Sequence, residues 1–121
     1  MEIPEAINHK SIVFLYEGLA TAMFVFIVNL SAGSPFIPFA AVCVVFTNII
    51  FLAPITGGHF NPAITAGIFL QLPNKAKNFP MFLTMTLGQF AGAFLGAFLA
   101  YFVMGGKYLE ENDGVVVALM P

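Results

Sequence analysis

Long apolar runs alternate with short polar breaks along this 121-residue chain. Three of the runs, at about 11–33, 39–53 and 81–104, approach or exceed the roughly 20 residues that an α-helix needs to cross the hydrocarbon core of a bilayer. The middle run is the shortest, and Pro54 ends it. The pattern therefore predicts an all-α membrane protein with three transmembrane helices.

A fourth apolar segment, within about 54–72, is set off by the polar, glycine-rich sequence that precedes it. Asn61 is a preferred N-cap residue and Pro62 fits the first helical position, so a helix is predicted to begin at Pro62 and to end near Leu72. Its roughly 11 residues would cover about 16 Å, which is half of a bilayer. Backbone that enters a membrane without crossing it must be buried in protein or line a wet cavity. We therefore predict a re-entrant half-helix with the positive end of its dipole at Asn61.

Composition supports this assignment and excludes other classes of protein. Hydrophobic residues make up 60% of the chain and charged residues 8%, with a mean hydropathy of +0.94. Four lysines, no arginine and a net charge of -2 offer no surface for nucleic acid. The sequence has no nucleophile with a base, no metal-ligand cluster and no phosphate-binding loop, so we predict no enzyme activity, no catalytic residue, no metal and no cofactor. The single cysteine, Cys43, is predicted to be a small buried hydrophobic residue.

The lysines determine the predicted orientation. Three crossings place Lys10, Lys75 and Lys77 on one side of the membrane and Lys107 on the other, within an acidic polar tail at 105–121. The positive-inside rule then places the N-terminus and the half-helix loop on the inner side, which is the cytoplasm or the mitochondrial matrix. The acidic N-terminal segment does not resemble the basic start of a signal peptide, so the first apolar run is expected to stay in place. The organelle is left open, with the mitochondrial inner membrane as one candidate.

Glu17 is a carboxylate within the first predicted membrane helix. Such a group needs a partner, because a charge without one is costly to bury. Two interpretations follow: Glu17 is a proton or substrate ligand, or it accepts hydrogen bonds that tie down the glycine-rich loop. The second is favoured, because the N–H groups of that loop have to be satisfied.

The last apolar run carries Gly88, Gly92 and Gly96 at strict four-residue spacing. Small residues repeated in this way form a ridge on which another helix packs closely, but the spacing does not identify that helix. Gln89 lies beside the ridge. We interpret it as a group that makes hydrogen bonds between helices, with pore lining as the alternative.

Three stretches in the order found here resemble motifs of the aquaporin and glycerol-facilitator family, the major intrinsic proteins. The first Asn-Pro-Ala signature of that family is similar to the sequence that opens the half-helix. The other two are a Glu followed four residues later by Thr, and a glutamine beside a glycine ridge. The stretches are Glu17 to Thr21, Gly58-His59-Phe60-Asn61-Pro62-Ala63, and Gly88-Gln89 to Gly92-Ala93 and Gly96.

The resemblance implies the six-helix channel fold of the family, in which two inverted halves each contribute a half-helix that meets the other at mid-membrane. It implies that Asn61 donates hydrogen bonds to passing water or glycerol, that the half-helix dipole helps to exclude cations, and that Glu17 holds the loop. His59 would either expose its backbone carbonyl to the pore or brace the loop, and bracing is favoured. The residues of this pore element are Gly58, His59, Asn61, Pro62 and Ala63.

The sequence matches only the first half of the family pattern. It has no second Asn-Pro-Ala, no arginine for a selectivity filter, and Ala41 where the family often has an aromatic residue. A half-helix left uncovered would expose unsatisfied polar groups to lipid at a cost of several kcal/mol each. Besides membrane lipids, we therefore expect at least one further membrane protein chain as a partner.

Two functions fit this expectation. The preferred one is a half-channel for water or small neutral solutes, completed by a second copy or by a separate second half. The alternative is a non-transporting accessory subunit of a larger complex, for example a mitochondrial respiratory complex, derived from a degenerate half.

Overall fold

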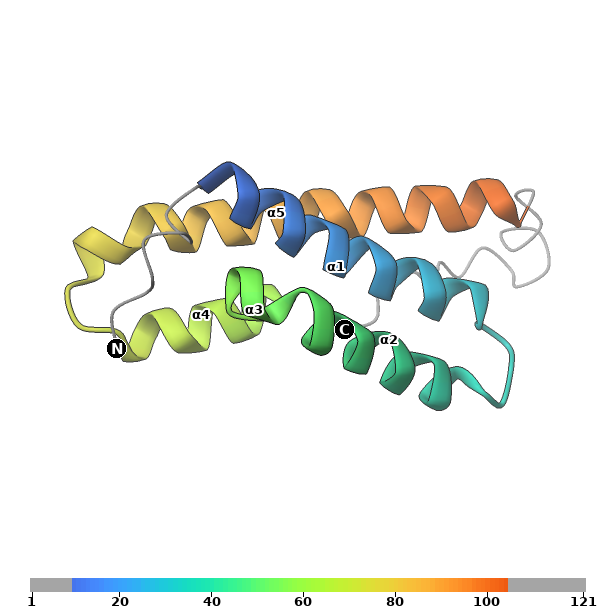
Figure 1. The fold of residues 1–121 in the computed structure, drawn as a ribbon. Coiled ribbons are helices and arrows are strands. Elements are labelled where there is room, and N and C mark those ends of the chain that lie inside the picture. The colour runs from blue at the N-terminus through green and yellow to red at the C-terminus, as the bar shows by residue number, and fades with distance from the viewer. Residues whose placement is uncertain (1–9, 105–121) are drawn as a thin grey trace.

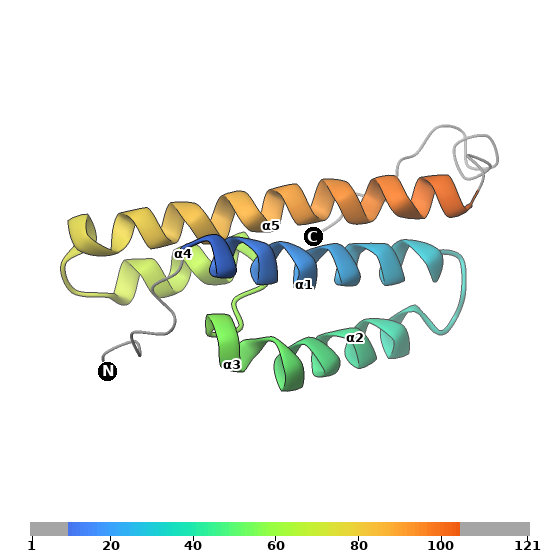
Figure 2. The ribbon, with the colours of Figure 1, turned by 45° about the horizontal axis from the view of Figure 1, so that its top comes forward.

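The computed structural model describes residues 10–104, and all of its regular structure in that range is helical. The two long helices α1 and α5 lie side by side (Figures 1 and 2). The helices α2 and α3 pack on α1, and α4 packs on α5. The predicted tail at 105–121 lies outside the described residues. The helices are α1 (Lys10–Leu30), α2 (Ile37–Phe51), α3 (Ala53–Thr56), α4 (Pro62–Gln71) and α5 (Lys75–Val103).

Within residues 10–104, two helices are long and apolar enough to cross a membrane, α1 with 21 residues and α5 with 29. The helix α2 has 15 residues and α4 has 10, which is shorter than a full span. The all-α class is confirmed. Three complete crossings and the re-entrant placement of α4 stay predictions.

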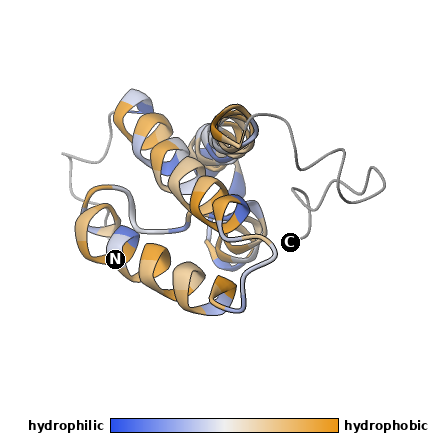
Figure 3. Ribbon diagram, turned by 90° about the vertical axis from the view of Figure 1, so that its right-hand side faces the viewer, coloured by the Kyte–Doolittle hydropathy of each residue, from blue (hydrophilic) through white to orange (hydrophobic). Residues whose placement is uncertain are grey.

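The distribution of polarity is the reverse of that in a water-soluble domain. The largest fully buried side chains include Gln89, Glu17 and Asn48, whereas Phe94 and Phe102 are 72% and 75% exposed. Hydrophobic residues predominate along the helices (Figure 3). A protein with polar groups inside and aromatic groups outside is suited to a lipid environment, where exposed apolar side chains carry no penalty.

Several helix ends differ from the prediction by a few residues, and two of these differences have a local cause. The helix α5 begins at Lys75 and not near Met81, because the Asn74 side chain caps it by accepting the Lys77 N–H at 3.2 Å. Pro80 therefore lies inside the helix, near its start, where it removes one backbone hydrogen bond. The predicted polar connection is shorter than expected as a result.

The other boundary concerns Pro54 and the end of α2. This helix ends at Phe51, and Pro54 lies in the first turn of α3, where its missing N–H needs no partner.

The prediction that Cys43 is buried is wrong, because Cys43 is exposed. The reason is that α2 has few neighbours and buries only Val44 and Asn48.

The glycine ridge of α5 packs against α1 of the same chain. The three ridge glycines are buried, and a Cβ added to any of them would overlap a carbonyl oxygen of α1. Since the contacts advance in the same direction along both helices, α1 and α5 are parallel. The opposed pairs are Gly88 with Phe14, Gly92 with Gly18, and Gly96 with Ala22.

Gly92→Ala should destabilise the fold by about 1–3 kcal/mol, because the new methyl group overlaps the Gly18 backbone. Gly67→Ala is the matched control, since an added Cβ there meets nothing within 4 Å. That control should be neutral or stabilising by up to about 1 kcal/mol, as expected for glycine in a helix. Unfolding of the full chain in increasing SDS measures both effects. Equal stability of the two variants would contradict the close packing of α1 on α5.

Candidate functional site

The loop 57–61 joins α3 to α4 through three residues with left-handed backbone: Gly57 (φ 96°), Gly58 (φ 75°) and Phe60 (φ 48°). A Cβ on Gly58 would lie 2.6 Å from the Ala53 side chain, so this position needs glycine for space as well as for its backbone angle. The glycines allow the chain to reverse sharply and to start α4 at Pro62.

Glu17, from α1, is completely buried beneath this loop. All four of its hydrogen-bond partners are neutral donors, and two of them are backbone N–H groups of the loop. These contacts join the loop 57–61 to α1. The Glu17 Oε1 atom accepts from the Thr56 hydroxyl (2.6 Å) and the His59 N–H (3.3 Å), and Oε2 accepts from the Phe60 N–H (2.7 Å) and the Gln89 amide Nε2 (2.7 Å).

Thr21 is a second residue of α1 that binds the loop. Its hydroxyl lies 3.2 Å from the Phe60 carbonyl oxygen and 2.8 Å from the Glu17 carbonyl oxygen in its own helix. Both backbone polar groups of Phe60 are thus bonded to α1. A left-handed conformation at a residue other than glycine costs about 1–3 kcal/mol, and the surrounding bonds offset that cost.

A second set of bonds joins α4 and α5 to the same network. The Gln89 Nε2 atom, which donates to Glu17, also lies 2.9 Å from the Thr65 hydroxyl, and that hydroxyl lies 3.2 Å from Nδ1 of His59. Gln89 is fully buried and bonds to side chains of α1 and α4. The His59 ring is thus linked to Gln89 through the Thr65 hydroxyl.

Two members of the network, Thr56 and Thr65, were not predicted from the sequence. Thr65 is 1% exposed and lies one helical turn after Asn61, so the four-residue spacing was a usable signal. Thr56 is 3% exposed and lies in α3, whose existence the sequence pattern did not indicate.

Asn61 caps the N-terminus of α4. Its side-chain Oδ1 accepts the Ala63 N–H at 2.8 Å, and its backbone carbonyl accepts the Thr65 N–H at 3.0 Å. Asn61 itself is exposed. Within residues 10–104, neither its Nδ2 group nor the Ile64 N–H has a partner. The start of α4 therefore presents unused hydrogen-bond donors on an open side of the molecule.

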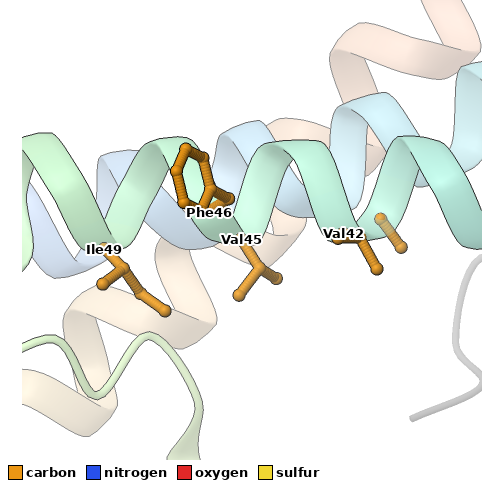
Figure 4. A pocket seen from close by; sticks show the side chains of 5 residues that line it. Val42, Val45, Phe46 and Ile49 are labelled. Atoms are coloured by element: carbon orange, nitrogen blue, oxygen red, sulfur yellow. The ribbon is translucent and has the colours of Figure 1, made fainter.

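Other candidate chemistry is not found in the described part of the chain. No group of three or more His, Cys, Asp or Glu residues in this part could hold a metal ion. A shallow groove of about 400 Å³ lies along the outside of α2, and its lining is apolar (Figure 4). It contains Ala41 but none of the network residues. The groove is formed by Ala41, Val42, Val45, Phe46 and Ile49.

These features define an all-α membrane protein in which buried polar groups brace a glycine-rich loop and the capped start of a short helix. The chain belongs to the major intrinsic protein family, whose model matches residues 5–120. The resemblance seen in three motifs is thereby confirmed. Members of this family are channels and not enzymes, and this chain is an integral membrane protein.

One relative matches part of the chain. The protein named Aquaporin-1 from Rhizophagus irregularis is 40% identical over 73 residues, which cover 57% of this chain and 25% of the relative. The matched region is thus a quarter of the length of that relative. No solved structure matches the chain significantly.

Replacing Glu17 by Gln should destabilise the protein by about 2–4 kcal/mol, because an amide NH₂ would face donors that need an acceptor. The measurement is unfolding in SDS or by heat in detergent. The double variant Glu17→Gln with Gln89→Glu restores an acid and amide pair between the helices but not the acceptor for the loop. It should therefore stay destabilised. Full recovery in the double variant would show that the contact between helices, and not the loop, determines the role of Glu17.

Proposed function

We propose that this chain contributes one Asn-Pro-Ala half-helix to a transmembrane pore for water or small neutral solutes. The observation that carries the proposal is the hydrogen bonding of the exposed Asn61 side chain. Its Oδ1 atom is used by the helix cap, which leaves Nδ2 to donate to a solute at an exposed position. Membership of a family of channels supports the same conclusion.

The restriction to neutral solutes follows from the electrostatics of α4. The N-terminus of a helix carries about half a positive charge, and in α4 it lies at Asn61. A helix of 10 residues is about 15 Å long, so α4 reaches from the membrane surface to about mid-membrane if its other end lies at the interface. A positive potential at that depth would repel cations.

The orientation proposed for the pore rests on the lysines. Because α1 and α5 are parallel, their N-terminal ends lie at the same end of the molecule (Figure 1). These ends carry Lys10, Lys75 and Lys77. The positive-inside rule then favours the inner side of the membrane for this end.

A second set of helices is proposed to cover the open side of α4, together with lipid around the remainder. Thr65 is the only buried residue in α4, while Ile64 and Leu70 are 50% and 71% exposed. In hydrocarbon, the unused donors at Asn61 and Ile64 would cost several kcal/mol each. A complementary half would remove this cost and form the opposite wall of the pore.

Asn61→Asp should lower the permeability of reconstituted vesicles by about ten-fold without unfolding the protein. Aspartate keeps the oxygen that caps α4 but replaces the Nδ2 donor with an acceptor. Asn74→Asp makes the same chemical change at the cap of α5, away from α4's N-terminus, and should leave permeability unchanged. Stopped-flow light scattering measures the rate. Wild-type vesicles that are no more permeable than protein-free vesicles would overturn the proposed pore.

The native mass of the assembly tests the proposed covering half. The chain alone has a mass of 13.0 kDa. After mild detergent extraction, native mass spectrometry should find it with a second set of membrane helices, either another copy or a different polypeptide. Recovery as a single 13.0 kDa chain would contradict the proposal. Quantitative co-migration with a large enzyme complex, without solute permeation, would instead indicate the accessory subunit.

A further inference from the structure

The C-terminal end of α4 is capped by a side chain from the next helix. The last carbonyl groups of a helix have no partner within it. Here the Lys75 ammonium donates to two of them, the carbonyl oxygens of Phe69 (2.9 Å) and Leu70 (2.5 Å), and also to the carbonyl oxygen of the C-cap residue Leu72 (2.8 Å). An ammonium group has three N–H donors, so these contacts use all of them.

The surrounding turn is fixed by further contacts. The Lys75 ammonium lies 5.6 Å from the centre of the Phe69 ring, and that ring stacks on Phe82 of α5 at 4.6 Å between ring centroids. The Asn78 side chain donates to the carbonyl oxygens of Pro73 (2.8 Å) and Asn74 (3.1 Å). Hydrogen bonds and ring contacts in this turn therefore join the C-terminal end of α4 to the start of α5.

The helix α4 packs on α5, and Thr65 is its only buried residue. Hydrogen bonds from side chains also hold the helix at its two ends. The Glu17 and Gln89 network holds the N-terminal end, and Lys75 holds the C-terminal end. Because Asn61 caps the N-terminal end of this helix, its position depends on both attachments.

We infer that Lys75 is a positioning residue for the Asn-Pro-Ala half-helix: its ammonium neutralises the negative end of the α4 dipole and fixes the base of α4, which holds Asn61 in place. A cation at this end of a helix interacts favourably with the dipole, and three charge-assisted hydrogen bonds add direction to the attraction. The functional part of this inference rests on the proposed pore. The positional part rests on the contacts of Lys75 alone.

Lys77 provides the matched control. It lies in the same turn of α5 and is exposed like Lys75, but its ammonium makes no hydrogen bond or ion pair within the described range. Removing either lysine changes the net charge equally. Only the loss of Lys75 removes the cap from α4.

The test is hydrogen exchange, measured by mass spectrometry on the full chain extracted with its natural partners and placed in lipid nanodiscs. Lys75→Met should speed exchange in the segment 66–72 by about five-fold. Lys77→Met should change it by less than about two-fold, and exchange in α1 should be unaffected by either variant. Lys75→Arg keeps the charge and several donors, so it should restore most of the protection. Equal exchange in the two methionine variants, or no recovery with arginine, would overturn the inference.

Permeability measured on the same samples separates this inference from the proposed function. If Asn61 acts in a pore, Lys75→Met should reduce solute permeation relative to Lys77→Met. Permeation that is normal in Lys75→Met despite faster exchange in α4 would overturn the link to Asn61. Absence of permeation in the wild type, with the exchange difference intact, would overturn the pore and leave the structural role of Lys75 in place.

Discussion

The Glu17 carboxylate has no contact with solvent, so every hydrogen bond that it accepts has to come from the protein. Its donors come from α3, from the loop 57–61 and from α5, and these segments take their relative positions around it. The glycine ridge belongs to the same arrangement. Because α5 approaches the α1 backbone closely, Gln89 is near enough to reach both Glu17 and Thr65.

The arrangement also explains how a chain with so apolar an exterior obtains a defined structure. Between helices in lipid there is little hydrophobic driving force, so close packing and hydrogen bonds determine which surfaces meet. The contacts of α1 with α5 supply the packing, and the network around Glu17 supplies the hydrogen bonds. The apolar side chains outside are then free to face lipid or other protein.

Sequence reasoning was most successful where local chemistry decides the structure. The start of α4 follows from Asn61 and Pro62, and the interaction of Glu17 with the loop followed from counting backbone donors. It was less successful where contacts between helices distant in sequence determine the structure. Spacing alone could not show that the ridge packs on α1, and the burial of Thr65 depends on helices distant in sequence. The early start of α5 was missed because a left-handed Asn74 forms the cap, a geometry that apolar periodicity does not reveal.

The order of the donors along the chain has a consequence for membrane insertion. Three of the four groups that bind Glu17 belong to residues 56–60, and only Gln89 comes from α5. During synthesis from the N-terminus, α1 and the loop therefore emerge before α5 does. The backbone N–H groups of the loop can bind the Glu17 carboxylate as soon as the loop is made. The helix α5 then packs on a structure in which α1 and the loop are already joined. The loop can thus be held on α1 before the ridge that closes the bundle has left the ribosome.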